Sequence, residues 1–128
     1  YGHGARVIFS CLLELAKFGP EGTGIVDDAF MFGSTSFPRQ ADWGATRDVV
    51  AGRLVHGYCP EDTLLARRTS VNLAGPVPFG QPPSGVKAAR RNGVEDIELH
   101  ELRPRAGKIY SDYKDQITTC LLKAGAEV

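Results

Sequence analysis

The chain lacks a long hydrophobic run and an excess of charge of one sign. Among its 128 residues, 15 basic side chains balance 15 acidic ones. No stretch reaches the length of about 18 apolar residues that a membrane-spanning helix needs. A nucleic-acid or anionic-membrane surface would need a basic excess. The composition therefore predicts no nucleic-acid partner and no membrane span within this chain.

Cysteine is also scarce. Cys11, Cys59 and Cys120 are odd in number, and their spacings match no zinc-ligand pattern, so no metal site is expected. Cys11 and Cys120 lie in apolar helical stretches, where we expect reduced thiols in the core. Reduced thiols favour an intracellular compartment.

Apolar periodicity divides the rest of the chain into alternating helices and strands. Three long helices are predicted over residues 4–17, 40–51 and 109–123, and three strands over residues 25–32, 53–58 and 94–100. The last strand alternates apolar and polar residues, which is typical of a half-exposed edge. A Gly- and Pro-rich middle is predicted to hold shorter helical and extended segments at residues 63–68 and 71–74 and a surface turn at 82–85. Long separations between strands require crossovers, so the predicted class is α/β with parallel strands.

The first helix is the most apolar segment. Residues 7–16 read VIFSCLLELA and leave almost no polar face. A helix of this kind has to be covered on most sides, and the natural cover is a sheet. Part of that sheet should precede Tyr1. We therefore expect a fragment of a larger protein, or a subunit of an assembly whose partner supplies the missing layer.

A tight glycine turn, Gly2-His3-Gly4, stands before this helix. In an α/β-hydrolase the nucleophilic Ser lies on a sharp strand-to-helix turn written G-x-S-x-G. When the last glycine of that pattern is aligned with Gly4, the nucleophile falls on Gly2, which has no side chain. A dinucleotide-binding G-x-G-x-x-G would need glycine at Val7 instead, so no cofactor is expected.

These residues resemble the DUF726 family of α/β-hydrolases, which includes the transmembrane and coiled-coil domain-containing protein 4 type. Residues 4–15 are similar to the family's helix after the nucleophile turn. Further similar segments follow in the family's order: FGS at 32–34, DW at 42–43, GRLV at 52–55, Tyr58, Asp62, NLAG at 72–75 and Pro78. The resemblance covers nearly the whole chain but only the family's C-terminal half. It implies that residues 1–128 are a partial α/β-hydrolase domain whose upstream strands are absent.

The resemblance also implies a Ser-Asp-His triad. The family's Ser corresponds to Gly2, its acid to Asp62 and its His to Lys108, in the stretch Gly-Lys-Ile-Tyr at 107–110. His3 holds the position whose backbone N–H belongs to the oxyanion hole. Glycine supplies no nucleophile, and an exposed lysine with a pKa of about 10.4 is a poor base. The prediction is a catalytically degenerate domain with a structural or interaction role.

Alternatives stay open for the domain and for Asp62. The domain could be an active serine esterase or lipase of the same family if the nucleophile comes from elsewhere. The space left at Gly2 could hold a small molecule. Asp62 could be a turn carboxylate that caps the following helical segment. Membrane association would come through a partner or an upstream region.

For the other histidines and the arginine pairs, a structural role or a surface position is expected. His56 is expected to be packed or hydrogen-bonded within its strand, and His100 to be a surface or partly packed strand histidine. The arginine pairs at 67–68 and 90–91, with Lys87 between them, are expected to form a solvated face or a contact with a partner or a phosphate.

Overall fold

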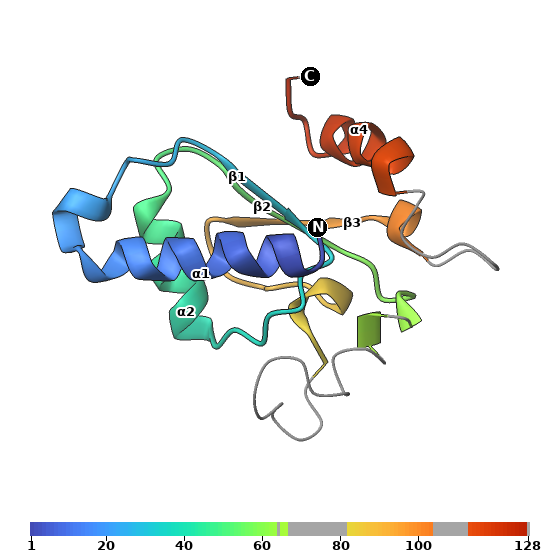
Figure 1. The fold of residues 1–128 in the computed structure, drawn as a ribbon, viewed down its shortest axis with the longest axis horizontal. Helices are drawn as coiled ribbons and strands as arrows, with labels where there is room; N and C mark the ends of the chain where they lie inside the picture. The colour runs from blue at the N-terminus through green and yellow to red at the C-terminus, as the bar shows by residue number, and fades with distance from the viewer. Residues whose placement is uncertain (64, 67–81, 104–112, 128) are drawn as a thin grey trace.

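The structure, a computed structural model, describes residues 1–63, 65–66, 82–103 and 113–127. Its helices are α1 (His3–Lys17), α2 (Gln40–Val49) and α4 (Tyr113–Lys123), and its strands are β1 (Ala29–Phe32), β2 (Leu54–Tyr58) and β3 (Val94–Glu98) (Figure 1). Three short 3₁₀ turns lie at Gly19–Gly22, Ser84–Val86 and His100–Leu102. The helices at residues 3–17 and 40–49 confirm the sequence prediction to within two residues.

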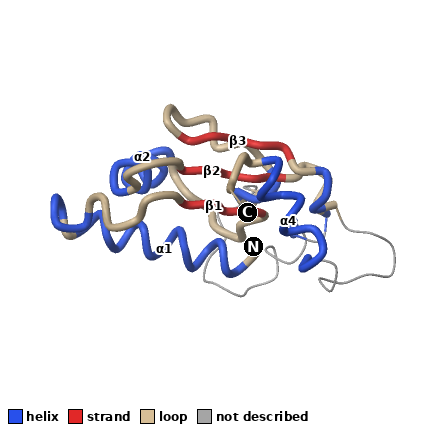
Figure 2. Tube along the Cα trace, turned by 90° about the horizontal axis from the view of Figure 1, so that it is seen from above, coloured by secondary structure: helices blue, strands red, loops and turns tan. Residues whose placement is uncertain are grey.

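The three strands form one parallel sheet in the order β1-β2-β3, with α1 on the β1 side of the molecule (Figure 2). Ala29 pairs with Leu54, and Leu54 pairs with Val94. Because β1 and β2 run in the same direction, α2 serves as the crossover between them. The α/β class with parallel strands and a crossover helix is confirmed. β3 is the half-exposed edge strand that its alternating sequence predicts.

Successive strand side chains enter two cores on opposite faces of the sheet. The first core holds α1 and α2 against the sheet; its members include Phe9, Leu12, Met31, Trp43 and Leu54. The second core holds α4 against the other face; its members include Phe32, Val55, Leu99, Cys120 and Ala124. The sheet is therefore covered by helices on both faces, as parallel sheets are.

β1 begins four residues later than the periodicity predicts. Val26 makes only an isolated bridge to Val50. Asp28 instead accepts a hydrogen bond from the Arg53 backbone N–H at 2.7 Å, and the Asp27 carbonyl accepts one from Gly52. The two aspartates thus fasten the start of β2 rather than extend β1. The apolar pattern of residues 25–32 could not reveal these bonds.

The prediction that Cys11 is a core thiol is wrong, because Cys11 is exposed. α1 turns the stripe of Ala5, Phe9 and Leu12 toward the sheet, and Cys11 lies on another side of the helix. Cys120 is buried and free, as expected, and Cys59 is also buried and free. Burial raises the pKa of the Cys120 thiol to about 11.

Several predicted segments lie partly or wholly outside the described residues. These are the extended segment at 71–74, half of the helical segment at 63–68 and the first four residues of the last predicted helix. The predicted surface turn at 82–85 is described, and it is not on the surface: Pro83, Ser84 and Gly85 are buried. Its backbone pairs with the residues after β1, since Ser84 donates to the Ser36 carbonyl and Gly85 to the Ser34 carbonyl, both at 2.8 Å.

Candidate functional site

The glycine turn at the start of α1 has the backbone that its sequence predicts. Gly2 has φ 57° and ψ −122° and directly precedes the helix. Its N–H donates to the Phe32 carbonyl at the end of β1 (3.1 Å), and the Gly4 N–H donates to the Tyr1 carbonyl (2.9 Å). The chain therefore lies against the end of β1 at Gly2 and is helical from the next residue. A side-chain-bearing residue in this region of φ is strained by about 1–3 kcal/mol.

The turn has room for a side chain but holds none. A Cβ built on Gly2 would meet no heavy atom within 4 Å. Gly2 itself is buried, and it lies at the carboxyl end of parallel strands, where α/β proteins bind their ligands. The nucleophile that the family resemblance expects at this position would need a side chain, and glycine has none.

Tyr1 connects the turn to Asp62. Its ring covers Gly33, where a Cβ would lie only 2.5 Å from Tyr1 Cε2. The Tyr1 hydroxyl donates a hydrogen bond to the Asp62 carboxylate. The sequence carried no signal for this link, because the two residues lie 61 positions apart and belong to different elements.

Asp62 is 3% exposed, and its Oδ1 accepts the Leu65 backbone N–H at 2.9 Å. Burial raises the pKa of this carboxyl, and the hydrogen bonds from Leu65 and Tyr1 only partly oppose that rise. Asp62 thus caps the helical turn that follows it, which is one of the two roles predicted from the sequence. Through Tyr1 it is also linked to the Gly2 turn. Among the described residues, no histidine is hydrogen-bonded to Asp62.

His3 is exposed, and its Nδ1 lies 3.2 Å from the Thr35 hydroxyl. Its backbone N–H belongs to the first turn of α1, whose N–H groups have no partner within the helix. That is the group an oxyanion hole uses at this position. Lys108, the residue at the base position, lies outside the described residues.

The other two histidines differ from each other. His56 is fully buried, and its Nδ1 lies 2.9 Å from Asp96 Oδ1, so the expectation of a packed and hydrogen-bonded histidine is confirmed. The prediction that His100 lies within a strand is wrong, because β3 ends at Glu98 and His100 opens the 3₁₀ turn after it. His100 is exposed, 3.8 Å from carboxylates of both Glu61 and Glu98.

Buried polar side chains gather in the segments that follow the parallel strands. They are Ser34, Thr35, Ser36, Asp62 and Ser84. The Ser34 hydroxyl accepts the Ser36 N–H at 3.2 Å and donates to the Ser36 hydroxyl at 3.0 Å. Within the part of the chain that the structure describes, these groups include no Ser–His–carboxylate chain.

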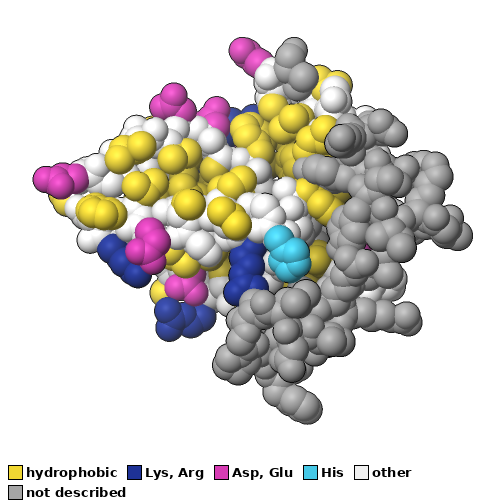
Figure 3. Space-filling view, viewed as in Figure 1, with side chains coloured by type: hydrophobic (Ala, Val, Ile, Leu, Met, Phe, Trp, Pro, Cys, Tyr) yellow, Lys and Arg dark blue, Asp and Glu magenta, His cyan; other side chains and the backbone are white. Residues whose placement is uncertain are grey.

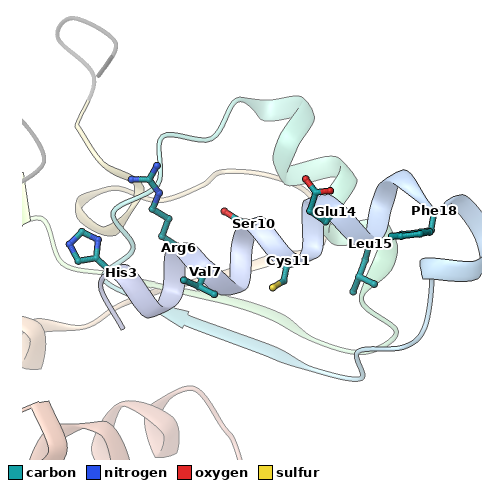
Figure 4. Close-up of a pocket in the computed structure, with 8 residues that line it drawn as sticks. All are labelled: His3, Arg6, Val7, Ser10, Cys11, Glu14, Leu15 and Phe18. Carbon is teal, nitrogen blue, oxygen red and sulfur yellow. The ribbon is translucent and has the colours of Figure 1, made fainter. Parts of the chain in front are cut away.

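An apolar strip lies along the outer side of α1 (Figure 3). A shallow groove there is lined by His3, Arg6, Val7, Ser10, Cys11, Glu14, Leu15 and Phe18 (Figure 4). Val7 is 61% exposed and Phe18 is 65% exposed. The sequence predicts that this helix is covered on most sides. The described residues cover only its inner side.

Comparison with known sequences decides the family. The sequence profile described as "Protein of unknown function (DUF726)" matches residues 1–77, which include the Gly2 turn, β1, β2 and Asp62. The chain belongs to the DUF726 family. No solved structure matches it significantly.

The DUF726 relatives are much longer proteins. The transmembrane and coiled-coil domain-containing protein STS1 of rice is 34% identical over 99 residues, which are 77% of this chain and 14% of STS1. An uncharacterized membrane protein of Caenorhabditis elegans is 42% identical over 62 residues, 48% of this chain and 10% of that protein. The probable lipase MIL1 of Saccharomyces cerevisiae is 41% identical over 63 residues, 49% of this chain and 6% of MIL1. The chain thus matches a small part of each.

The described parts of the DUF726 chain contain neither a candidate membrane-spanning helix nor a candidate metal-binding cluster. No helix there has the length and apolarity to cross a bilayer. No group of three His, Cys, Asp or Glu side chains there could hold a metal ion.

The backbone at Gly2 predicts opposite effects for two neighbouring glycines. Gly2→Ala should lower the free energy of unfolding by about 1–3 kcal/mol, because alanine is strained at φ 57°. Gly4→Ala, in helical backbone with open space around it, should be neutral or stabilising by up to about 1 kcal/mol. Urea unfolding of both variants measures the difference. Equal effects would mean that the strained turn does not exist.

The raised pKa of Asp62 predicts a pH-dependent stability. Between its ordinary value of 3.8 and its raised value, the folded chain holds a proton that the unfolded chain has lost. The free energy of unfolding therefore falls as pH rises through this window, by at most about 1.4 kcal/mol per pH unit. Asp62→Asn should remove this slope, and Asp48→Asn, at an exposed position on α2, controls for the lost charge. Urea unfolding across the acid range tests this, and an unchanged slope in Asp62→Asn would contradict it.

Proposed function

We propose that this DUF726 chain is part of an α/β-hydrolase-like domain that has lost catalysis and acts as a structural or interaction unit of a larger protein or assembly. The observation that carries the proposal is Gly2, which keeps the strained backbone of the nucleophile turn without a nucleophile. The turn is retained because it ends the sheet and begins α1, which are requirements of the fold and not of the reaction.

The free edge of β1 supports a missing upstream layer. β1 is the first strand of the described sheet and has β2 on one side only. The Gly2 N–H already donates to the last carbonyl of β1, Phe32. A strand that enters the turn from before Tyr1 would continue this pairing along β1. Its residues would belong to the larger part of the domain that lies outside the chain.

The outer strip of α1 supports an interaction role. Val7, Ile8 and Phe18 are exposed apolar side chains on a helix whose other side is buried in the first core. Exposed apolar surface of this kind marks contact with another layer of protein. We propose that the upstream part of the domain, or a partner in its place, covers this strip.

An active serine esterase or lipase is the second candidate. The name of the relative MIL1, probable lipase, favours it, and so does the buried carboxylate of Asp62 beside the turn. His100 follows the last strand, which is where the fold would place a base. This candidate requires a nucleophile other than residue 2.

The names of two relatives suggest a cellular location. Two of them are named as membrane or transmembrane proteins. We propose an intracellular domain that reaches a membrane through an upstream region or a partner.

Labelling with a fluorophosphonate probe separates the two candidates. The probe forms a covalent bond with an activated serine, and Gly2 supplies none, so the full-length protein should remain unlabelled while an added serine esterase in the same tube is labelled. Mass spectrometry reads the adduct. A stoichiometric adduct on any serine of the native protein, absent after heat unfolding, would overturn the proposal in favour of the esterase.

A further inference from the structure

We propose that the recess between the first turn of α2 and residues 83–90 binds a phosphate group. This inference is independent of the proposed loss of catalysis, because the recess shares no residue with the Gly2 turn. We call residues 83–90 the strap.

The recess lies between two walls and has a volume of about 400 Å³. Pro38, Gln40 and Trp43 form the wall at the start of α2, and the strap contributes Ser84 and residues 87–90. A buried aromatic ring on one wall and charged side chains on the other suit a small polar ligand.

Hydrogen bonds hold the strap in place. Asp96 accepts the backbone N–H of Ala89 at 2.8 Å and that of Arg90 at 3.0 Å. Gln40 Nε2 donates to the Ala89 carbonyl at 2.8 Å. Arg90 has φ 52°, a conformation that a non-glycine residue keeps only where the surroundings impose it.

The carboxylates near the recess already have partners. Asp96 takes the two strap N–H groups and His56 Nδ1. Burial alone would raise the pKa of Asp96, but these bonds outweigh it and lower the pKa. Asp42, in the first turn of α2, is paired with Arg39.

The cations at the recess have no such partners. Lys87 and Arg90 line it, and the guanidinium of neighbouring Arg91 lies against Gly44 of α2. Among the described residues, none of the three forms an ion pair. Five other cations do, namely Lys17, Arg39, Arg53, Arg103 and Lys123. Unpaired cations gathered at a recess indicate an anionic ligand.

A buried hydroxyl supplies the second, independent observation. Ser84 is 3% exposed and lines the recess, and its Oγ has no hydrogen-bond partner in the described structure. An unpaired buried hydroxyl costs about 1–3 kcal/mol, so a group that completes it is expected. Its backbone is fixed by the bond from Ser84 N–H to the Ser36 carbonyl.

Phosphate fits these groups best. Its oxygens can accept from the Ser84 hydroxyl and from Lys87 and Arg90, and the partial positive charge at the N-terminus of α2 favours an anion there. The phosphate could belong to a small phosphomonoester or to a lipid headgroup. Both present the same oxygens to the recess.

Trp43 provides the measurement, because it is the only tryptophan of the chain and lines the recess. Titration of the 128-residue chain with inorganic phosphate should change its fluorescence saturably. Ser84→Ala should weaken binding about 10-fold, and the double variant Lys87→Gln/Arg90→Gln at least about 10-fold. Lys17→Gln, which removes a charge at the far end of α1, should leave binding unchanged. Thermal melts show that each variant is folded.

Two further arms make the outcome decisive. Cosedimentation with phosphatidylcholine vesicles, with and without phosphatidic acid, distinguishes a lipid headgroup from a free phosphate. A headgroup site gives cosedimentation that requires phosphatidic acid and is lost in the double variant. Equilibrium dialysis of radiolabelled phosphate against the full-length protein gives a readout that does not depend on Trp43. Absence of saturable binding in dialysis, or equal weakening by Lys17→Gln, would overturn the proposal, as would an unchanged affinity in Ser84→Ala.

Discussion

The backbone conformation of Gly2 is the constraint on which the rest of the structure depends. At φ 57° Gly2 is bonded to the end of β1 and α1 begins at the next residue. The same turn brings the Tyr1 ring over Gly33, and a Cβ at Gly85 would lie 2.5 Å from the Gly33 carbonyl carbon. Three glycines thus let three backbone segments meet at the carboxyl ends of the strands. Asp62 joins them through the Tyr1 hydroxyl. Backbone bonds and glycine packing therefore hold this turn, with no side chain at residue 2.

α1 has two different sides. Its inner stripe of Ala5, Phe9 and Leu12 is buried against the sheet and α2. Its outer strip, with Val7 and Phe18, is exposed in the described chain. Under the proposal that the chain belongs to a larger α/β domain, a further layer would cover the outer strip, as a helix with apolar residues on both sides requires. The long DUF726 relatives, of which this chain matches a small part, are consistent with such a domain.

Local sequence patterns predicted the elements that have strong periodicity. The helix of residues 3–17, the crossover helix α2 and the edge strand β3 all follow from apolar spacing. The resemblance to the family placed Gly2 in its turn. A helix with apolar residues on most sides, however, does not reveal which side meets the sheet, so Cys11 was expected in the core and is exposed.

Contacts between distant residues account for the remaining errors. The link from Tyr1 to Asp62 and the burial of Ser84 against the residues after β1 depend on tertiary packing. The net charge of the whole chain likewise does not show where its charged residues lie in the structure. A chain with a formal charge of zero still gathers Lys87, Arg90 and Arg91, none of which forms an ion pair with another described residue.

Thiol accessibility of Cys11 tests most directly whether this architecture serves as an interaction unit. Cys11 is exposed on the outer strip of α1, while Cys59 and Cys120 are buried. Ellman's reagent should therefore react rapidly with one thiol in the isolated chain, and Cys11→Ser should abolish that phase. In the full-length protein, mass spectrometry of the alkylated peptide should find Cys11 protected until unfolding. Equal reactivity of Cys11 in the isolated chain and in the full-length protein with its partners would contradict the account.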